Sequence, residues 1–186
     1  MTLTEILPTL RRSIPVPIAA HCWPVHTEPT TTDVVVGGIS LMRLLEISDS
    51  PAILTGDLPR PRSQGTRDVG SGTDVSVLVF RITLRVDTQE SKRIALTDCT
   101  FDAIDARWEE CRLIGRASTS RNVEIELIPG EDGGSSWPHP TVSVPEDLRE
   151  GDILTVPCAG AITLHDVRPK TARLTPALAS PTARTK

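Results

Sequence analysis

The stretch that decides the fold is PEDLREGDILTVPCAGAITLHD, residues 145–166. Its first half combines proline, charge and glycine, which is typical of a turn, and ILTVP is an apolar run of strand length. The next three residues, CAG, form a corner of small side chains. We expect a second strand at residues 161–167 after this corner. Two short strands joined by a tight corner favour a β-structure.

The chain before this stretch shows the same strand-like pattern. In VSVLVFRITLRVD, residues 75–87, apolar and polar side chains alternate, which predicts a strand with one buried face carrying Phe80, Ile82, Leu84 and Val86. Seven or eight such segments with few helices predict an all-β protein, a barrel or a sandwich. The other expected strands cover residues 93–97, 107–115, 123–128, 141–144 and 153–157.

The N-terminal part is predicted to add one or two short helices. In TLTEILPTLRRS, apolar side chains recur at helical spacing, at Leu3, Ile6, Leu7 and Leu10. Two arginines stand near the end of this segment, where the helix dipole favours them. Further along, a valine run at 34–36 predicts a strand, and a glycine turn leads into a second helix that begins at the capping residue Ser40.

Length and composition bound the domain organisation. A chain of 186 residues has room for one domain, which we assign to residues 1–168. Within it, residues 57–74 contain glycine, proline and charge but almost nothing apolar, which predicts a flexible linker. Residues 130–140 are expected to form a long glycine-rich loop, and residues 169–186 a disordered tail.

Charge and hydropathy exclude several classes of partner. The net charge is −4 and the basic residues are dispersed, so the sequence predicts no nucleic-acid binding. No apolar run approaches the roughly 18 residues of a membrane span, and the N-terminus lacks the order of a secretory signal. We therefore expect a cytoplasmic protein that contacts no membrane.

The cysteines are predicted to be free, buried thiols of a reducing compartment. Cys22, Cys99, Cys111 and Cys158 are scattered without the CxxC spacing of a zinc site. One alternative is a metal bound by His21, Cys22 and His26. Because these three residues lie in a proline-rich loop with no fourth ligand in view, we predict no metal site.

The C-terminal half resembles the β-domain of the fold-type III, pyridoxal-phosphate-dependent decarboxylases, specifically the diaminopimelate and ornithine decarboxylase-like group. The family pattern P.L..GD.L.VP..GAYT is matched at Pro145, Leu148, Gly151, Asp152, Leu154, Val156, Pro157, Gly160, Ala161 and Thr163. The segments LPTLRRSIP, WP and VVVGGISLMRLLEISDSPAIL resemble the family's opening strand and short helix. The resemblance implies a single antiparallel Greek-key β-barrel like the decarboxylase C-terminal domain.

The same resemblance implies a large internal deletion. A family member would hold a (β/α)₈ barrel of about 250 residues between the two matching regions, where this chain has only residues 57–74. The Schiff-base lysine and the phosphate site belong to that barrel. The family's HCESGD motif falls on Ser118, Thr119 and Asn122, and the tyrosine of GAYT is replaced by Ile162. We therefore expect no pyridoxal phosphate or other cofactor and no decarboxylase activity.

Two classes of function stay open. The first is a small-molecule role in biosynthesis, in which the barrel interior, or the surface uncovered by the lost domain, holds an apolar ligand for cofactor-independent cyclisation or rearrangement. The candidate polar groups are Asp98, Glu124 and His165, and the candidate walls are Phe80, Trp108 and Ile162. Structural explanations compete with these assignments: a turn for Asp98, a solvated surface for Glu124 and His165, and core packing for Trp108.

The second class is a non-catalytic binding or regulatory partner of a full-length decarboxylase-like enzyme. In the family that this chain resembles, the β-domain helps to form the dimer. Exposed strand edges and an apolar patch once covered by the lost domain would favour association. This interpretation predicts a homodimer or a complex in solution, whereas the ligand-binding interpretation is compatible with a monomer.

Overall fold

The computed structural model describes residues 2–59, 74–88, 92–130 and 138–168. Strands dominate this part of the chain and the helices are short, which confirms a β-rich fold. The helices are α1 (Leu3–Ile6), η1 (Pro8–Arg12), α2 (Leu41–Ser48), η2 (Trp108–Glu110) and α3 (Leu164–Val167). The strands are β1 (Thr27–Pro29), β2 (Val34–Val36), β3 (Ile39–Ser40), β4 (Ala52–Asp57), β5 (Asp74–Asp87), β6 (Arg93–Thr97), β7 (Asp105–Ala106), β8 (Arg112–Ile114), β9 (Asn122–Pro129), β10 (Thr141–Pro145) and β11 (Ile153–Ala159).

Two sheets organise these strands. β1, β2 and β3 form a small antiparallel sheet, and the other strands form a large one with the order β10-β9-β6-β5-β11-β7. In addition, β4 pairs with β5, and β8 pairs with β11. The pairs of the large sheet are antiparallel except for β6 and β9, which run parallel.

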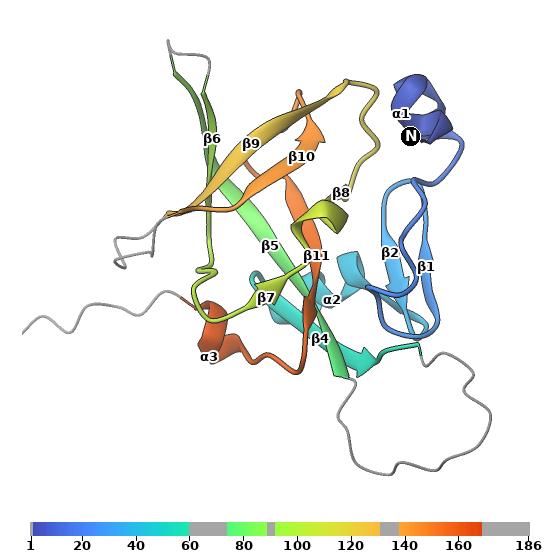
Figure 1. Ribbon diagram of the computed structural model, residues 1–186, viewed down its shortest axis with the longest axis vertical. Coiled ribbons are helices and arrows are strands. Elements are labelled where there is room, and N and C mark those ends of the chain that lie inside the picture. The colour runs from blue at the N-terminus through green and yellow to red at the C-terminus, as the bar shows by residue number, and fades with distance from the viewer. Residues whose placement is uncertain (1, 60–73, 89–91, 131–137, 169–186) are drawn as a thin grey trace, which may run out of the picture.

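The large sheet curls into a half-barrel because β5 is long enough to serve two sets of neighbours. Its first half pairs with β4 and β11, and its second half continues beyond β4 to pair with β6. From β6 the sheet bends back through β9 to β10, which comes close to β8 and η2 (Figure 1). In the described chain no strand ladder joins β10 to β8, so this side of the half-barrel is open.

Strand β5 is buried on both faces over its first half and so separates two cores. Leu78, Phe80 and Ile82 point into the curl of the sheet, where they pack against residues of β6, β9, β10 and β11. Val77 and Val79 point to the opposite face and pack with Trp23 and α2. This two-sided burial follows from the period of two along a strand.

A β-bulge corrects the prediction for the second half of this strand. Leu84 and Val86 were expected on the buried face with Phe80, but both are exposed. The pairing with β6 shifts between Ile82 and Leu84, so one extra residue of β5 reverses the alternation. Arg85, which pairs with the buried Ala95, therefore points inward in their place.

The N-terminal helix is also shorter than predicted. Leu7 and Pro8 divide it into α1 and the 3₁₀ helix η1, because a proline lacks the N–H that a continuous helix requires. The apolar face is reversed as well: Leu3, Ile6 and Leu7 are exposed. The buried residues of the segment are Thr4 and Arg11 instead.

Two expected strands are wrong in part. Residues 108–110 form η2, which leaves only Arg112–Ile114 as a strand of the predicted 107–115. Residues 161–167, expected as a strand, contain α3. There Asp166 Oδ2 accepts hydrogen bonds from the N–H and the hydroxyl of Thr163, at 2.8 and 2.7 Å. The TLHD sequence thus contains a capping signal that the strand interpretation missed.

Other local predictions are confirmed. β6 covers residues 93–97 as expected, and β9, β10 and β11 cover the expected strands with one or two further residues. The hydroxyl of Ser40 accepts a hydrogen bond from the N–H of Arg43 at 3.0 Å and so caps α2 as predicted.

Parts of three predicted segments lie outside the described residues: 60–73 of the linker, 131–137 of the loop, and the whole tail 169–186. The two ends of the linker are described, and Asp57 pairs with Asp74 where β4 ends and β5 begins. Among the helices of the described chain, none has the length and apolar character needed to cross a membrane.

Candidate functional site

A cleft lies where the N-terminal segment meets the open side of the half-barrel. Its volume is about 270 Å³. One wall comes from α1, η1 and the turn between β1 and β2, and the other comes from η2, β8, the residues after β8, and β10. The polar lining includes Arg11, Glu110, Arg112, Arg116, Asn122 and Ser143.

Arg11 is the most buried charged residue of this lining, with 8% of its surface exposed. Its guanidinium donates from Nε to the carbonyl of Thr4 at 3.2 Å and from Nη1 to the carbonyl of Ser120 at 3.0 Å. Burial lowers the pKa of Arg11, and the nearby charges of Glu5 and Asp147 oppose this shift. Among the described residues Arg11 makes no ion pair, and both of its hydrogen-bond acceptors are neutral carbonyls.

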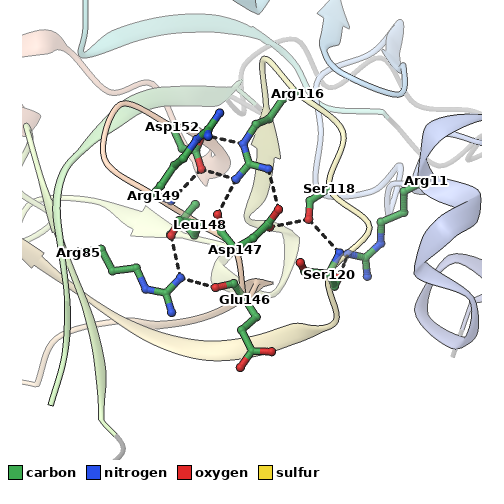
Figure 2. Close-up of polar contacts among 10 residues, drawn as sticks. All are labelled: Arg11, Arg85, Arg116, Ser118, Ser120, Glu146, Asp147, Leu148, Arg149 and Asp152. Carbon is green, nitrogen blue, oxygen red and sulfur yellow. Dashed lines mark hydrogen bonds and ion pairs between the residues drawn. The ribbon is translucent and has the colours of Figure 1, made fainter. Parts of the chain in front are cut away.

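Arg116 is held in the opposite way, by two carboxylates (Figure 2). It contacts Asp152 with Nε at 2.8 Å and Nη2 at 2.6 Å, and it also donates from Nη1 to Asp147 at 3.0 Å. The hydrogen bond with Asp152 is the main reason that the pKa of Arg116 is raised. This arginine fastens the chain after β8 to the turn between β10 and β11.

The carboxylate of Asp147 is shared between Arg116 and Ser118, whose hydroxyl donates to it at 2.5 Å (Figure 2). Partial burial raises the pKa of Asp147, but the hydrogen bonds from Ser118 and Arg116 outweigh it and the net shift is downward. Ser118 also accepts a hydrogen bond from the N–H of Ser120 at 3.1 Å. These contacts fix the Ser120 carbonyl, which is one of the two groups that hold Arg11.

A second polar cluster, centred on the cleft residue Glu110, connects the N-terminal segment to β8. Oε2 of Glu110 accepts hydrogen bonds from Nε1 of Trp23 at 2.8 Å, from Nη2 of Arg112 at 2.9 Å and from the N–H of Ala19 at 3.1 Å. The guanidinium of Arg112 lies 5.1 Å from the centre of the Trp23 ring and donates to the carbonyl of Val16. The proline-rich N-terminal stretch is thereby fastened to β8.

The three predicted catalytic groups lie apart from one another and outside the cleft. Glu124 is exposed on β9, in a larger but shallow groove of about 520 Å³ beside Lys92 and Arg93. Oδ1 of Asp98 accepts the N–H of Arg81 at 3.0 Å, which is a structural role at a strand end. His165 is exposed on α3. None of these contacts tests a catalytic role, and the three assignments stay predictions.

The three predicted wall residues do share one environment, the core inside the curl. Phe80 is fully buried and packs edge-on against Phe101, which packs in the same way against Trp108. Ile162 is partly buried against the same core. None of the three lines the cleft or the shallow groove, and all three pack in or against the apolar core of the half-barrel. A substrate-binding role for them stays a prediction.

The cysteines are free, as predicted, and Cys99, Cys111 and Cys158 are buried. Burial raises the pKa of Cys111 and of Cys158 to about 12. Cys22 is half-buried between the exposed His21 and the buried Trp23. Within the described ranges, no three His, Cys, Asp or Glu side chains gather as metal ligands.

Sequence reasoning missed both arginines that define the cleft. Arg11 was explained by the dipole of a helix that is in fact interrupted, and Arg116 carries no motif. Of the residues aligned with the HCESGD motif, Ser118 and Asn122 line the cleft, and so does Pro145 of the other family pattern. The alignment was therefore the signal that pointed to this region. No protein-family model matches this chain, and no curated protein matches it.

Proposed function

We propose that this chain is a small-molecule-binding β-protein whose ligand site is the cleft between the N-terminal segment and strands β8 and β10. The observation that carries the proposal is the cavity of about 270 Å³ enclosed by segments that are far apart in the sequence. Two partly buried ion pairs, Arg116 with Asp152 and Glu110 with Arg112, hold its walls. Pre-formed cavities with a few placed polar groups are typical of ligand sites.

We further propose that the fold is a Greek-key barrel derived from the decarboxylase β-domain by loss of its cofactor-binding barrel. The pairing of Asp57 with Asp74 supports this origin, because an excision between β4 and β5 leaves their ends adjacent. The residues present do not fit pyridoxal phosphate: Lys92, the one lysine of the described chain, is exposed beside Arg93. Adding the cofactor should therefore give no Schiff-base absorbance band.

The chemistry we propose for the cleft is cofactor-independent cyclisation or rearrangement. Such an isomerisation conserves every atom of the substrate, and its rate can be raised by holding a flexible molecule in a reactive conformation. Asp33 and Glu110 of the lining are committed to structural hydrogen bonds. The contribution of the cleft in this proposal is shape and orientation.

The test compares metabolites by mass spectrometry in strains that carry the wild-type gene, no gene, or a variant with a filled cleft. Ser143 is exposed on β10 and lines the cleft, so Ser143→Trp should fill it. Thr141→Trp is the matched control, since Thr141 is exposed two residues earlier on the same strand but outside the cleft. We expect a same-mass isomer to accumulate without the gene and with Ser143→Trp only. Identical profiles in all strains would overturn the proposal.

A second candidate function is association with another β-domain, with a homodimer as the first case. The observation in its favour is a group of exposed apolar side chains on the N-terminal segment, Leu3, Ile6, Leu7, Ile14 and Val16. Light scattering should then give a dimer mass for the wild type and a monomer mass for a variant with Ser at positions 3, 6 and 7. A monomeric wild type would remove this candidate.

A further inference from the structure

The positive charge of Arg11 is not paired with any carboxylate of the described chain. The residue is 8% exposed, and both of its hydrogen-bond acceptors are neutral carbonyls. A buried charge is costly unless it is paired, and arginine stays protonated at any physiological pH. Among the arginines that line the cleft, Arg112 and Arg116 each contact a carboxylate, whereas Arg11 contacts none of the described ones.

The two acidic groups that act on Arg11 electrostatically are Glu5 and Asp147. Asp147 is held by Ser118 and Arg116, and Glu5 accepts the N–H of Thr2 at the start of α1. Both are therefore oriented toward other donors. The negative charges of Glu5 and Asp147 lower the free-energy cost of burying Arg11, but neither residue forms an ion pair with it.

The guanidinium also has an unused donor that faces accessible space. Nε and Nη1 are bonded to carbonyls, and Nη2 donates to no described residue. Ser50 Oγ is the one fully buried side-chain nitrogen or oxygen without a partner in the described chain, so Nη2 of Arg11 keeps some accessible surface. Arg11 is one of the residues that line the cleft, so a ligand bound there would lie beside this side chain.

Two further groups of the lining could complete an anion site. The amide of Asn122 and the hydroxyl of Ser143 belong to the paired strands β9 and β10, and both side chains are exposed with no partner among the described residues. Carboxylates also line this cleft, among them Asp33, Glu109 and Glu110. One unpaired cation among several carboxylates suits a monoanion better than a phosphate dianion.

We infer that Arg11 anchors the carboxylate group of the small molecule that binds in the cleft, with Asn122 and Ser143 as further hydrogen-bond donors. Nη2 of Arg11 can donate a hydrogen bond to a carboxylate oxygen, and a charge-assisted bond in a partly buried site is strong. The inference rests on the proposed ligand site and adds the chemical class of its ligand. It also replaces the apolar ligand expected from the sequence with an anionic one.

The test is a titration of ¹⁵N-labelled protein with benzoate, followed through the Nε–Hε signals of arginine, with phosphate and chloride as competing anions. We expect a saturable shift of the Arg11 signal, with Arg12 as an internal reference because it is exposed on the same 3₁₀ helix. Arg11→Lys keeps the charge but loses Nη2 and the carbonyl contacts that orient it, and it should weaken binding at least about tenfold. Arg12→Lys should leave the affinity unchanged.

Three results would overturn the inference: a linear shift that chloride reproduces, tighter binding of phosphate than of benzoate, or undiminished affinity in Arg11→Lys. The wild-type titration decides the matter even if the variant does not fold. Failure of the ligand site itself is distinguished by Ser143→Trp. Suppose that benzoate binds the wild type saturably, that Ser143→Trp abolishes this binding, and that Arg11→Lys leaves the affinity unchanged. The cleft then binds ligands, but Arg11 does not anchor them.

Discussion

The guanidinium of Arg116 meets the carboxylate of Asp152 in a two-point contact, with Nε at 2.8 Å from one oxygen and Nη2 at 2.6 Å from the other. The contact joins the chain after β8 to the turn before β11, and the side chain of Asp152 is only 7% exposed. It extends the pairing of β8 with β11, in which Ile114 faces Ile153, by one side-chain contact, and it gives the cleft one fixed wall.

Replacing Asp152 should therefore destabilise the whole fold. Asp152→Asn leaves the Arg116 guanidinium with a weaker partner beside Asp147, and losing a hydrogen bond between charged groups costs about 1.5 kcal/mol. We expect a loss of that order in the free energy of unfolding measured by urea denaturation. Arg149→Gln is the control, because Arg149 is 75% exposed and lies 3.9 Å from the same carboxylate, so its loss should cost at most about 0.5 kcal/mol. Equal effects of the two variants would contradict this account.

The hydrogen bonds and the ion pair of Glu110 should hold the N-terminal segment in place. Glu110→Gln keeps the size of the side chain but removes the charge that faces Arg112, and both side chains are largely buried. We expect the N-terminal stretch up to Trp23 to loosen, and limited proteolysis should then cut it faster than in the wild type. Glu109→Gln, at the exposed neighbouring position, should leave the cleavage rate unchanged. Resistance of Glu110→Gln to proteolysis would show that packing alone holds the segment.

The hydrogen bond from Ser118 to Asp147 should contribute stability that depends on pH. Since the pKa of Asp147 is lowered in the folded state, its contribution is present above the unfolded value of about 3.9 and is lost as the pH falls through the lower folded value. Ser118→Ala should cost roughly 1 kcal/mol or less at pH 7, because Asp147 is half-exposed and solvent screens it. Urea midpoints of the two proteins should converge as the pH falls below the folded pKa of Asp147. A constant difference across pH would refute the link to Asp147.

The thiols should differ in reactivity according to burial. Burial raises the pKa values of Cys111 and Cys158 to about 12, and Cys99 is shifted upward for the same reason. At pH 8 we expect a thiol reagent to modify Cys22 alone in the folded protein, and all four cysteines in denaturant. Mass spectrometry counts the adducts, and Cys22→Ser should abolish native-state labelling. Rapid labelling of a buried cysteine would indicate that the core opens.

Much of the local structure followed from patterns of a few residues. The run ILTVP forms β11 and Ser40 caps α2, because strand alternation and a capping hydroxyl act over short distances. The expectation failed where two local signals competed. Residues 161–167 were apolar enough for a strand, but the Thr163 and Asp166 pair stabilises a helical turn there.

The candidate site was much less accessible to such reasoning. Its lining comes from the N-terminus, from the middle of the chain and from β10. Sequence periodicity does not predict that these distant segments come together. The residues singled out in advance were either committed to the core, as Phe80 is, or exposed on separate elements, as Glu124 and His165 are. The family alignment included a few residues of the lining, among them Ser118, Asn122 and Pro145.

The sequence by itself determined that the chain is β-rich, where most of its strands run and that its thiols are free, since these properties depend on composition and near neighbours. Only the tertiary structure decided which way individual side chains point. One extra residue at the bulge turned Leu84 outward and Arg85 inward, and the break at Pro8 buried Arg11 in place of the leucines around it. These orientations depend on hydrogen-bond acceptors from distant parts of the chain. The carbonyls of Glu146 and Leu148 accept from Arg85, and the carbonyl of Ser120 accepts from Arg11. A guanidinium that leaves the solvent needs such acceptors.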